Sequence, residues 1–445
     1  MESQRGPIVV TGTGAVSAWG WGVAPFLEGL RSGGTAIRAL ERFAGEGHRT
    51  AVAAEVPPAK PGMEGRFPAW ARFSLAERFA LAAAVEAVEG AGAREPALGA
   101  DPAAVGVFFG GSTAGMLESE ELVRPERRTA PEGEAGQGTA STAPPEIELL
   151  AAQPLDAPAG AVARHFAVAG PVVTVSSACA SGTQGLGLAL EALRSGEVDV
   201  ALAGGADSLC RLTYAGFNAL RVVGETACRP FREGRDGMTL GEGAGVLVLE
   251  TEARARRRGA PALARLLGVG NSCDAHHMTA PHPEGLGAAL AIERAFRDAG
   301  LLPEGGALDF VNAHGTGTPL NDLSEWRGML RVLGEAARRV PVTATKASVG
   351  HLLGSSGAIE AVATVLGLSC REVYPTAGAE PDGTDALDPE CPAHLVTGGP
   401  RSFAGHARRG AGGGLALSTS FGFGGANAAA LFGPAGAGTP ERESP

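Results

Sequence analysis

VVTVSSACASGTQGLGLALEALRSG, residues 172–196, opens with a β-branched run that is typical of a buried strand. After Cys179, small residues lead into a pattern of leucines that predicts an amphipathic helix ending at Gly196. A cysteine at a strand-to-helix turn lies near backbone N–H groups and the positive end of a helix, which lower the pKa of a thiol. Cys179 is therefore either a nucleophile or a small apolar side chain that fills the core.

The chain around this segment alternates between predicted strands and predicted helices. Hydrophobic runs predict strands at residues 7–14, 105–111, 199–207, 246–250, 262–268, 310–313, 342–345, 417–421 and 428–432. Ala- and Leu-rich patterns with capping residues predict helices at residues 26–32, 75–92, 287–299, 323–333 and 357–366. This alternation predicts a layered α/β fold whose two halves meet in a basic stretch at residues 252–259.

Two segments lack the periodicity of helices or strands. Residues 118–148 are charged and then rich in Pro, Gly, Ser and Thr, so we expect a surface excursion there. Residues 433–445 are expected to form a disordered tail. The predicted units are residues 1–255, which carry Cys179, residues 256–432, and this tail.

The composition excludes several classes of protein. Hydrophobic residues make up 44% and charged residues 19% of the 445 residues, which is ordinary for a soluble globular protein. The net charge of −11 argues against binding to nucleic acid or to an anionic membrane. No apolar run is long enough to span a membrane, and the N-terminus lacks a basic, apolar leader. The six cysteines contain no CxxC pair, which argues against a zinc site or a disulfide framework and favours a reducing cytoplasm.

Three loops that follow predicted strands carry polar or glycine-rich motifs. VNAHGTGTPLND contains His314, and TKASVGHLLGSSGAIE contains Lys346 and His351. TSFGFGGAN, residues 419–427, is dense enough in glycine to bring backbone N–H groups close to a substrate oxygen. Because active sites of α/β folds gather in loops at strand ends, these motifs are candidates for one shared site.

Each of these features also has a structural interpretation. A histidine in a loop often serves only as a hydrogen-bonding residue, and glycine clusters often mark only tight turns. Lys346 is one of two lysines in an arginine-rich chain, which suggests that an ammonium is needed there, but it can also form an ordinary salt bridge with Glu360. A metal site of His314, His351 and Asp322 is a further alternative, although their spacing is unlike that of metal ligands.

The motifs SSACASG, NAHGTGTPLND, KASVGHLLGSSGA and SFGFGGAN, in this order and spacing, resemble those of the β-ketoacyl-acyl carrier protein synthases. These are condensing enzymes of the thiolase superfamily, and the match is closest to the elongating type II synthases. The segments RDGMTLGEGAGVLVLE and VGNSCDAHHMTAPHPEG also resemble family segments, so the resemblance covers residues 7–432. It implies a thiolase-like α/β fold in which two similar halves form a five-layer αβαβα sandwich.

The resemblance implies a role for each chemical group. Cys179 would hold the acyl group as a thioester. His314 and His351 would donate hydrogen bonds to the thioester carbonyl of the malonyl-carrier substrate as carbon dioxide leaves. Lys346 would orient the site and pair with Glu360. The two histidines distinguish this set from initiating synthases, which have one His and one Asn, and from thiolases, which use a second Cys.

Other positions match the family's binding residues. The backbone N–H groups of Cys179 and Phe423 would form an oxyanion hole, and Phe423 would also gate the entry of the second substrate. Thr316 and Thr318 would bind the pantetheine arm of the carrier. The structural network behind the histidines corresponds to Asp322 and Glu325.

Three departures from the family pattern bear on which acyl group is used. Thr113 stands where a bulky apolar residue of the acyl pocket is usual, and Met238 stands where an aromatic is common. The segment at residues 118–151 is longer and more polar than usual, and it precedes a region expected at a dimer interface. These changes fit a polyketide or other specialised pathway as well as fatty-acid synthesis.

The expected partner is an acyl carrier protein with phosphopantetheine-linked acyl and malonyl groups. Because the carrier and this chain are both acidic, docking needs a local basic patch, for which we predict Arg72, Arg78 and Arg221; ordinary solvated arginines are the alternative. We expect a homodimer or a heterodimer with a related subunit, and no cofactor, metal, nucleic acid or membrane. A non-catalytic partner subunit would lack the nucleophile, and a thiolase-like degrading enzyme would carry a second cysteine in the glycine loop.

Overall fold

The computed structural model describes residues 6–42, 47–67, 70–93, 97–123, 150–303, 308–378, 386–403 and 414–436. The first half of the chain contributes β1 (Ile8–Ser17), β5 (Val105–Gly110), β6 (Val172–Val175), β7 (Val200–Asp207) and β8 (Gly243–Thr251). The second half contributes β9 (Ala264–Cys273), β10 (Leu308–Asn312), β11 (Pro341–Thr343), β15 (Leu415–Phe421) and β16 (Ala426–Pro434). All of them belong to one sheet, which the short strands β2 (Gly20–Trp21) and β13 (His394–Leu395) complete.

Both halves arrange their strands in the same order. The series β6-β5-β7-β8-β1 in the first half corresponds to β11-β10-β15-β16-β9 in the second. In each series the first three strands are mutually parallel, and the last two pair antiparallel with their neighbours. The halves join where β1 pairs with β9 at Val9 and Val10. This repetition confirms an α/β fold of two similar halves, while the boundary at residue 255 stays a prediction.

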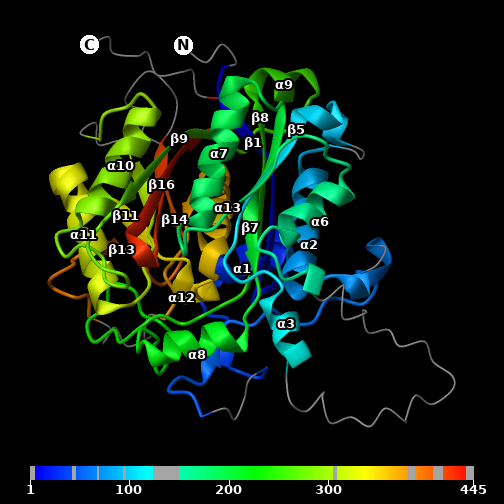
Figure 1. The fold of residues 1–445 in the computed structure, drawn as a ribbon. Coiled ribbons are helices and arrows are strands. Elements are labelled where there is room, and N and C mark those ends of the chain that lie inside the picture. The colour runs from blue at the N-terminus through cyan, green and yellow to red at the C-terminus, as the bar shows by residue number, and fades with distance from the viewer. Residues whose placement is uncertain are drawn as a thin grey trace, which may run out of the picture.

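Helices lie between and outside the two halves of the sheet (Figure 1). α7 (Ser181–Ser195) and α13 (Ser356–Cys370) lie between the halves and contact strands of both. α2 (Leu75–Gly90) and α6 (Ala157–His165) cover the outside of the first half, and α10 (Leu286–Asp298) and α11 (Pro319–Leu333) lie outside the second. The fold is therefore the expected five-layer αβαβα sandwich.

Glycines allow the two central helices to approach the sheet and each other closely. A Cβ on Gly110, at the end of β5, would lie 2.3 Å from the backbone nitrogen of Gly182 in α7. A Cβ on Gly182 would in turn lie 2.7 Å from the backbone nitrogen of Ala358 in α13. Because no side chain fits there, glycine brings the first turns of α7 and α13 together beside β5.

In the described residues, Leu353–Cys370 is the one helical stretch long and apolar enough to cross a membrane, and 89% of it is buried inside the protein.

The strand predicted as buried at residues 172–175 is instead the edge strand β6. Val172 is 43% exposed, because β6 pairs only with β5 and is the last strand of the sheet. A β-branched run is typical of a buried strand, but it also suits a half-exposed edge strand. The edge leaves one row of backbone groups without a strand partner among the described residues.

Other differences concern short elements and ends. Short helices that show too few turns for a periodic pattern were not predicted: α3 (Met116–Val123), α6, α8 (Arg211–Ala219), α9 (Glu252–Arg257) and α12 (Lys346–Val349). α3 lies in the predicted surface excursion, whose remainder at residues 124–149 is outside the described residues. β16 continues to Pro434, so the predicted tail begins too early, and residues 437–445 are also outside the described residues. The remaining elements include α1 (Val23–Ser32) and the strand pairs β3 (Arg38–Ala39) with β4 (Val52–Ala53) and β12 (Glu372–Val373) with β14 (Arg401–Ser402).

Candidate active site

Cys179 lies in the tight turn between β6 and α7. Its backbone forms a bridge with Ser177, and the intervening Ala178 has a positive φ of 52°. This left-handed conformation is costly for a residue with a side chain, so the surrounding packing must hold the turn. Gly422 packs against it, since a Cβ there would lie 3.0 Å from the backbone nitrogen of Cys179. The residue is only 6% exposed and lines a cavity.

Burial raises the pKa of the Cys179 thiol to about 11. The Lys346 ammonium and the backbone N–H of Phe423 act in the opposite direction without outweighing the loss of solvation. The lowered pKa expected from the strand-to-helix turn is therefore wrong, because a thiolate in this cavity has lost its water. Cys179 rests as a thiol, so its proton has to leave as the sulfur attacks.

Lys346, His314 and Glu360 form a buried chain of polar groups. The Lys346 ammonium contacts the Glu360 carboxylate, and its Nζ lies 2.9 Å from Nδ1 of His314. An ammonium has only donors, so Nδ1 of His314 accepts and the ring carries its proton on Nε2. Burial and the Lys346 charge hold the pKa of His314 well below its usual value, which keeps the imidazole neutral. Burial also raises the pKa of Glu360 to about 7, against the opposing effect of Lys346.

His351 has its Nδ1 occupied in the same way. This atom accepts a hydrogen bond from the backbone N–H of Leu353 at 3.0 Å and another from the hydroxyl of Ser356 at 2.8 Å. The ring proton is therefore on Nε2, which is buried and has no partner among the described residues. Burial, followed by the Lys346 charge, holds the pKa of His351 well below its usual value. A buried donor without a partner is costly, so this N–H is free to serve a ligand.

The two histidines and the thiol line one cavity of about 320 Å³. The imidazole rings are 5.5 Å apart between centroids and stand at 89° to each other. Two neutral N–H donors in a buried site stabilise an oxygen that gains negative charge, because they do not need to reorganise as the charge develops.

Two buried carboxylates hold the loop that carries His314. Glu325 in α11 accepts hydrogen bonds from the backbone N–H groups of His314 and Gly315, both at 2.8 Å. Asp322 accepts from the backbone N–H of Gly317 at 3.2 Å. Burial raises the pKa of Glu325 to about 7 and also raises that of Asp322. Both carboxylates thus lie where the sequence predicted a supporting network.

Other predicted residues line the same cavity: Arg221, Met238, Thr316, Thr318 and Phe423. The ring of Phe423 stacks on Phe217 of α8, with centroids 5.6 Å apart. Neither Phe217 nor Ser356 was predicted, since an aromatic on a short helix and a serine in a glycine loop give no separate sequence signal. The resemblance of the segment LGSSGA to the family motif is the sequence signal that points to Ser356.

Thr113 and Arg78 lie elsewhere than predicted. Thr113 is not among the residues that line the cavity, and its hydroxyl lies 2.9 Å from both the Asp207 carboxylate and the Ser208 carbonyl. Arg78 donates to the carbonyls of Trp70 at 3.1 Å and Ala71 at 3.3 Å. Its half-buried guanidinium therefore bonds to the backbone of the segment that precedes α2.

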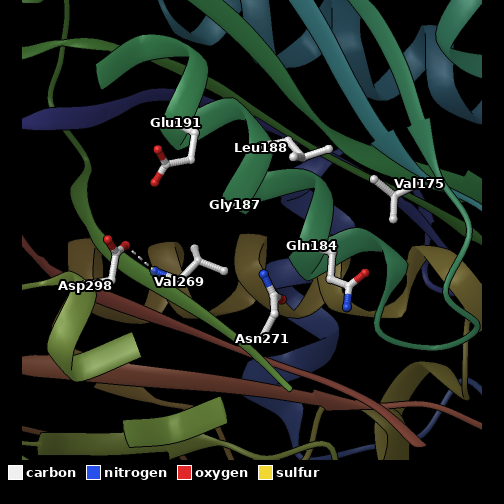
Figure 2. A pocket seen from close by; sticks show the side chains of 8 residues that line it. All are labelled: Val175, Gln184, Gly187, Leu188, Glu191, Val269, Asn271 and Asp298. Atoms are coloured by element: carbon white, nitrogen blue, oxygen red, sulfur yellow. Dashed lines mark hydrogen bonds between the residues drawn. The ribbon is translucent and has the colours of Figure 1, made fainter. Parts of the chain in front are cut away.

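No group of three or more His, Cys, Asp or Glu side chains in the described part of the chain is arranged to hold a metal ion. A second cavity, of about 300 Å³, lies along α7 and β9 (Figure 2). Val175 of β6 and Leu188 of α7 line it, with Asn271 and Asp298 on the facing side. None of the predicted catalytic side chains contributes to it.

Two family models match the chain. Beta-ketoacyl synthase, N-terminal domain, matches residues 5–255, and Beta-ketoacyl synthase, C-terminal domain, matches residues 263–380. The 3-oxoacyl-[acyl-carrier-protein] synthase 2 of Staphylococcus aureus (strain COL) is 34% identical over 441 residues, which cover 97% of this chain and 99% of that protein.

Solved structures of ketosynthases are similar to this chain over nearly its whole length. The ishigamide ketosynthase/chain length factor superposes with a TM-score of 0.83 at 32% identity, covering 97% of this chain and 100% of that one. AntDE:AntF, a type II PKS acyl-carrier protein in complex with its ketosynthase bound to the hexaketide, superposes with a TM-score of 0.81 at 28% identity, covering 97% and 100%.

Proposed function

This chain belongs to the beta-ketoacyl synthase family, and we propose that its cavity performs a decarboxylative condensation in fatty-acid or polyketide chain elongation. An acyl group on Cys179 joins a malonyl group carried by an acyl carrier protein, and β-ketoacyl carrier protein is released. The observation that carries this proposal is the placement of two neutral Nε2–H donors, from His314 and His351, in one cavity with the thiol.

The first step is acyl transfer. The Cys179 sulfur attacks the thioester of an acyl carrier, and the C–S bond to the carrier breaks. Because burial keeps Cys179 as a thiol, its proton passes to the departing carrier sulfur, and a free carrier thiol leaves. The backbone N–H groups of Cys179 and Phe423 are proposed to hold the oxygen of the tetrahedral intermediate.

The second step joins decarboxylation to carbon–carbon bond formation. As malonyl carrier loses carbon dioxide, charge moves to its thioester oxygen, which accepts hydrogen bonds from Nε2–H of His314 and His351. The enolate carbon then attacks the acyl carbonyl on Cys179, and the C–S bond to the enzyme breaks. The released Cys179 sulfur takes up a proton from water and returns to the resting thiol. Lys346 donates a hydrogen bond to Nδ1 of His314, so the ring proton of His314 stays on Nε2, which serves as the donor in the cavity. Thr316 and Thr318 are proposed to bind the pantetheine arm.

Two other functions fit less well. A non-catalytic subunit of a heterodimer would lack the nucleophile, yet Cys179, His314, Lys346 and His351 are all present. A thiolase-like degrading enzyme would carry a second cysteine in the glycine loop, and residues 419–427 contain none. The chain can still pair with a chain-length subunit while it supplies the chemistry itself.

The test uses the purified chain with labelled acyl carrier protein and malonyl carrier. Label is expected on Cys179 in the first half-reaction, and β-ketoacyl carrier is expected when malonyl carrier follows. A chain that takes label but forms no product in the presence of malonyl carrier would contradict the condensation. Donors of varied length and saturation then define the acyl specificity, for which Met238 is the cavity residue that departs from the family pattern.

Arg221 is the proposed docking residue for the acidic carrier, since it is exposed and lines the cavity. Arg72 is also exposed, on a short 3₁₀ helix at Trp70–Arg72, whereas Arg78 is engaged within the fold. We expect Arg221→Glu to lower turnover of malonyl carrier roughly 10-fold, because it reverses a charge at the entrance, while acylation by a small acyl thioester is unchanged. Arg331→Glu is the control, since Arg331 is 48% exposed in its side chain and does not line the cavity. Equal loss of both half-reactions in Arg221→Glu would contradict docking.

The chain is proposed to act in the cytoplasm as a dimer. β6 is an edge strand, and the neighbouring face of α7 exposes Leu188 by 43% beside the cavity of Figure 2. An apolar face continuous with a strand edge favours pairing with a second, similar subunit. Sedimentation of the chain purified alone is expected to give a homodimer; a monomer would indicate instead that a related partner subunit is required.

A further inference from the structure

Asp207, at the end of β7, is a fully buried carboxylate outside the predicted site. Its oxygens accept hydrogen bonds from the backbone N–H groups of Ser112 at 2.8 Å and Thr113 at 2.7 Å, and from Ala114 at 3.3 Å. They also accept from the backbone N–H of Ser355 at 3.1 Å. One carboxylate therefore joins the loop after β5 to the turn before α13.

That turn, the 3₁₀ helix Leu353–Ser355, also carries the partner of a histidine. The backbone N–H of Leu353 donates to Nδ1 of His351, and Leu353 itself has a positive φ of 54°. The backbone N–H of Gly354 donates to the Ser112 hydroxyl at 3.1 Å. A left-handed conformation at a leucine persists only where its neighbours hold it, and the bonds to both following residues do so.

We propose that Asp207 is a positioning residue for the condensation: it fixes the Leu353–Ser355 turn so that Nδ1 of His351 stays an acceptor and its Nε2–H points into the cavity. Asp207 does not line the cavity, so it acts on His351 through the turn, and its charge adds a smaller electrostatic effect on the Cys179 thiol. The inference rests on the proposed function, since it names what holds one donor of the same site.

The chemistry of the contacts explains why a carboxylate is needed. All the groups that face Asp207 are N–H or O–H donors, and a carboxylate offers only acceptors. An asparagine would turn an NH₂ group toward donors and leave at least one of them without a partner. Because His351 serves decarboxylation and not acylation of Cys179, the resulting defect should be selective.

The test compares half-reactions in Asp207→Asn. Release of carbon dioxide from malonyl carrier is expected to fall roughly 10- to 100-fold, because His351 loses its fixed orientation. The rate of Cys179 acylation in a single turnover is expected not to fall, because the lost Asp207 charge is one that raises the pKa of the Cys179 thiol. Glu250→Gln is the matched control. Glu250 is also a fully buried carboxylate, but it forms ion pairs with Arg254 and Arg258 and not with the Leu353–Ser355 turn. Equal loss in both half-reactions, or full decarboxylation in a folded Asp207→Asn variant, would overturn the proposal.

A second variant and the tautomer of His351 provide two further tests of the role of Asp207. If Asp207→Asn does not fold, Ser112→Ala is the second variant. It removes the hydroxyl that accepts from the Gly354 N–H and donates to Asp207, and the same selective loss is expected on a smaller scale. No loss in that variant would count against the role. Nitrogen chemical shifts of His351 report its tautomer without any substrate: Nε2–H is expected in the wild type and a mixture in Asp207→Asn. An unchanged tautomer contradicts positioning, whereas a wild-type enzyme that does not decarboxylate malonyl carrier contradicts only the proposed function.

Discussion

Cys179→Ala is expected to lower condensation at least about 10⁴-fold, because alanine offers no atom that can hold the acyl group. Malonyl carrier should still lose carbon dioxide in this variant, since His314 and His351 keep their Nδ1 partners and their donors face the cavity. The measurement follows both label incorporation from acyl carrier and release of carbon dioxide from malonyl carrier. Label incorporation is expected to be lost, and release of carbon dioxide is expected to be retained.

The control for this substitution is Cys391→Ala, because Cys391 is equally a buried cysteine and lies outside the cavity. Cys391→Ala also removes one sulfur atom from a packed interior, so its cost in folding stability should be comparable to that of Cys179→Ala. Acylation of Cys179 should nevertheless continue in the Cys391→Ala variant. Condensation at the wild-type rate in Cys179→Ala would overturn the assignment of the nucleophile. Loss of both half-reactions together with a lowered melting temperature would show that Cys179 acts mainly in packing.

His314→Ala and His351→Ala should each lower decarboxylation about 10²- to 10³-fold, the usual cost of removing one donor from a developing oxyanion. The double variant should lose much less than the product of the two effects, since both donors serve the same oxygen and neither works well alone. Acylation of Cys179 is expected to survive in all three variants. Rates of carbon dioxide release and of single-turnover acylation give the double-mutant cycle.

A useful comparison is His394→Ala, which changes a histidine in β13 that does not line the cavity. It should leave both half-reactions intact. If the losses of His314→Ala and His351→Ala multiply in the double variant, the two imidazoles act on different atoms. The shared oxyanion proposed for them would then be wrong.

The residues that follow predicted strands could be found from the sequence because strand ends of an α/β fold converge. Spacing and resemblance selected Cys179, His314, Lys346 and His351, and the structure brings them together. The α/β class and the repeated halves followed from the alternation of elements. What the sequence did not reveal is the tautomer of each ring, which depends on hydrogen bonds from residues such as Ser356.

The wrong predictions have physical causes that local sequence does not carry. The direction of the Cys179 pKa depends on how completely the folded chain excludes water from the thiol. The side chain of Thr113 turns toward Asp207, which is distant in sequence and becomes its neighbour only because β5 pairs with β7. Similarly, β6 is exposed because, in the part of the chain that the structure describes, no strand continues the sheet beyond it.

The placement of α7 and α13 between the two halves of the sheet ties catalysis to the cooperativity of the whole fold. Cys179 precedes the first turn of α7, and Glu360 lies in the first turns of α13, where glycines press the helices together. α13 cannot fray toward solvent without parting strands on both sides of it, whereas α7 has one exposed face at Leu188. Reactive groups in many enzymes sit on segments that open locally, but here we expect heat inactivation to follow the unfolding of the layers that enclose α13. Tolerance to heat is therefore expected to depend on the packing of the innermost layer.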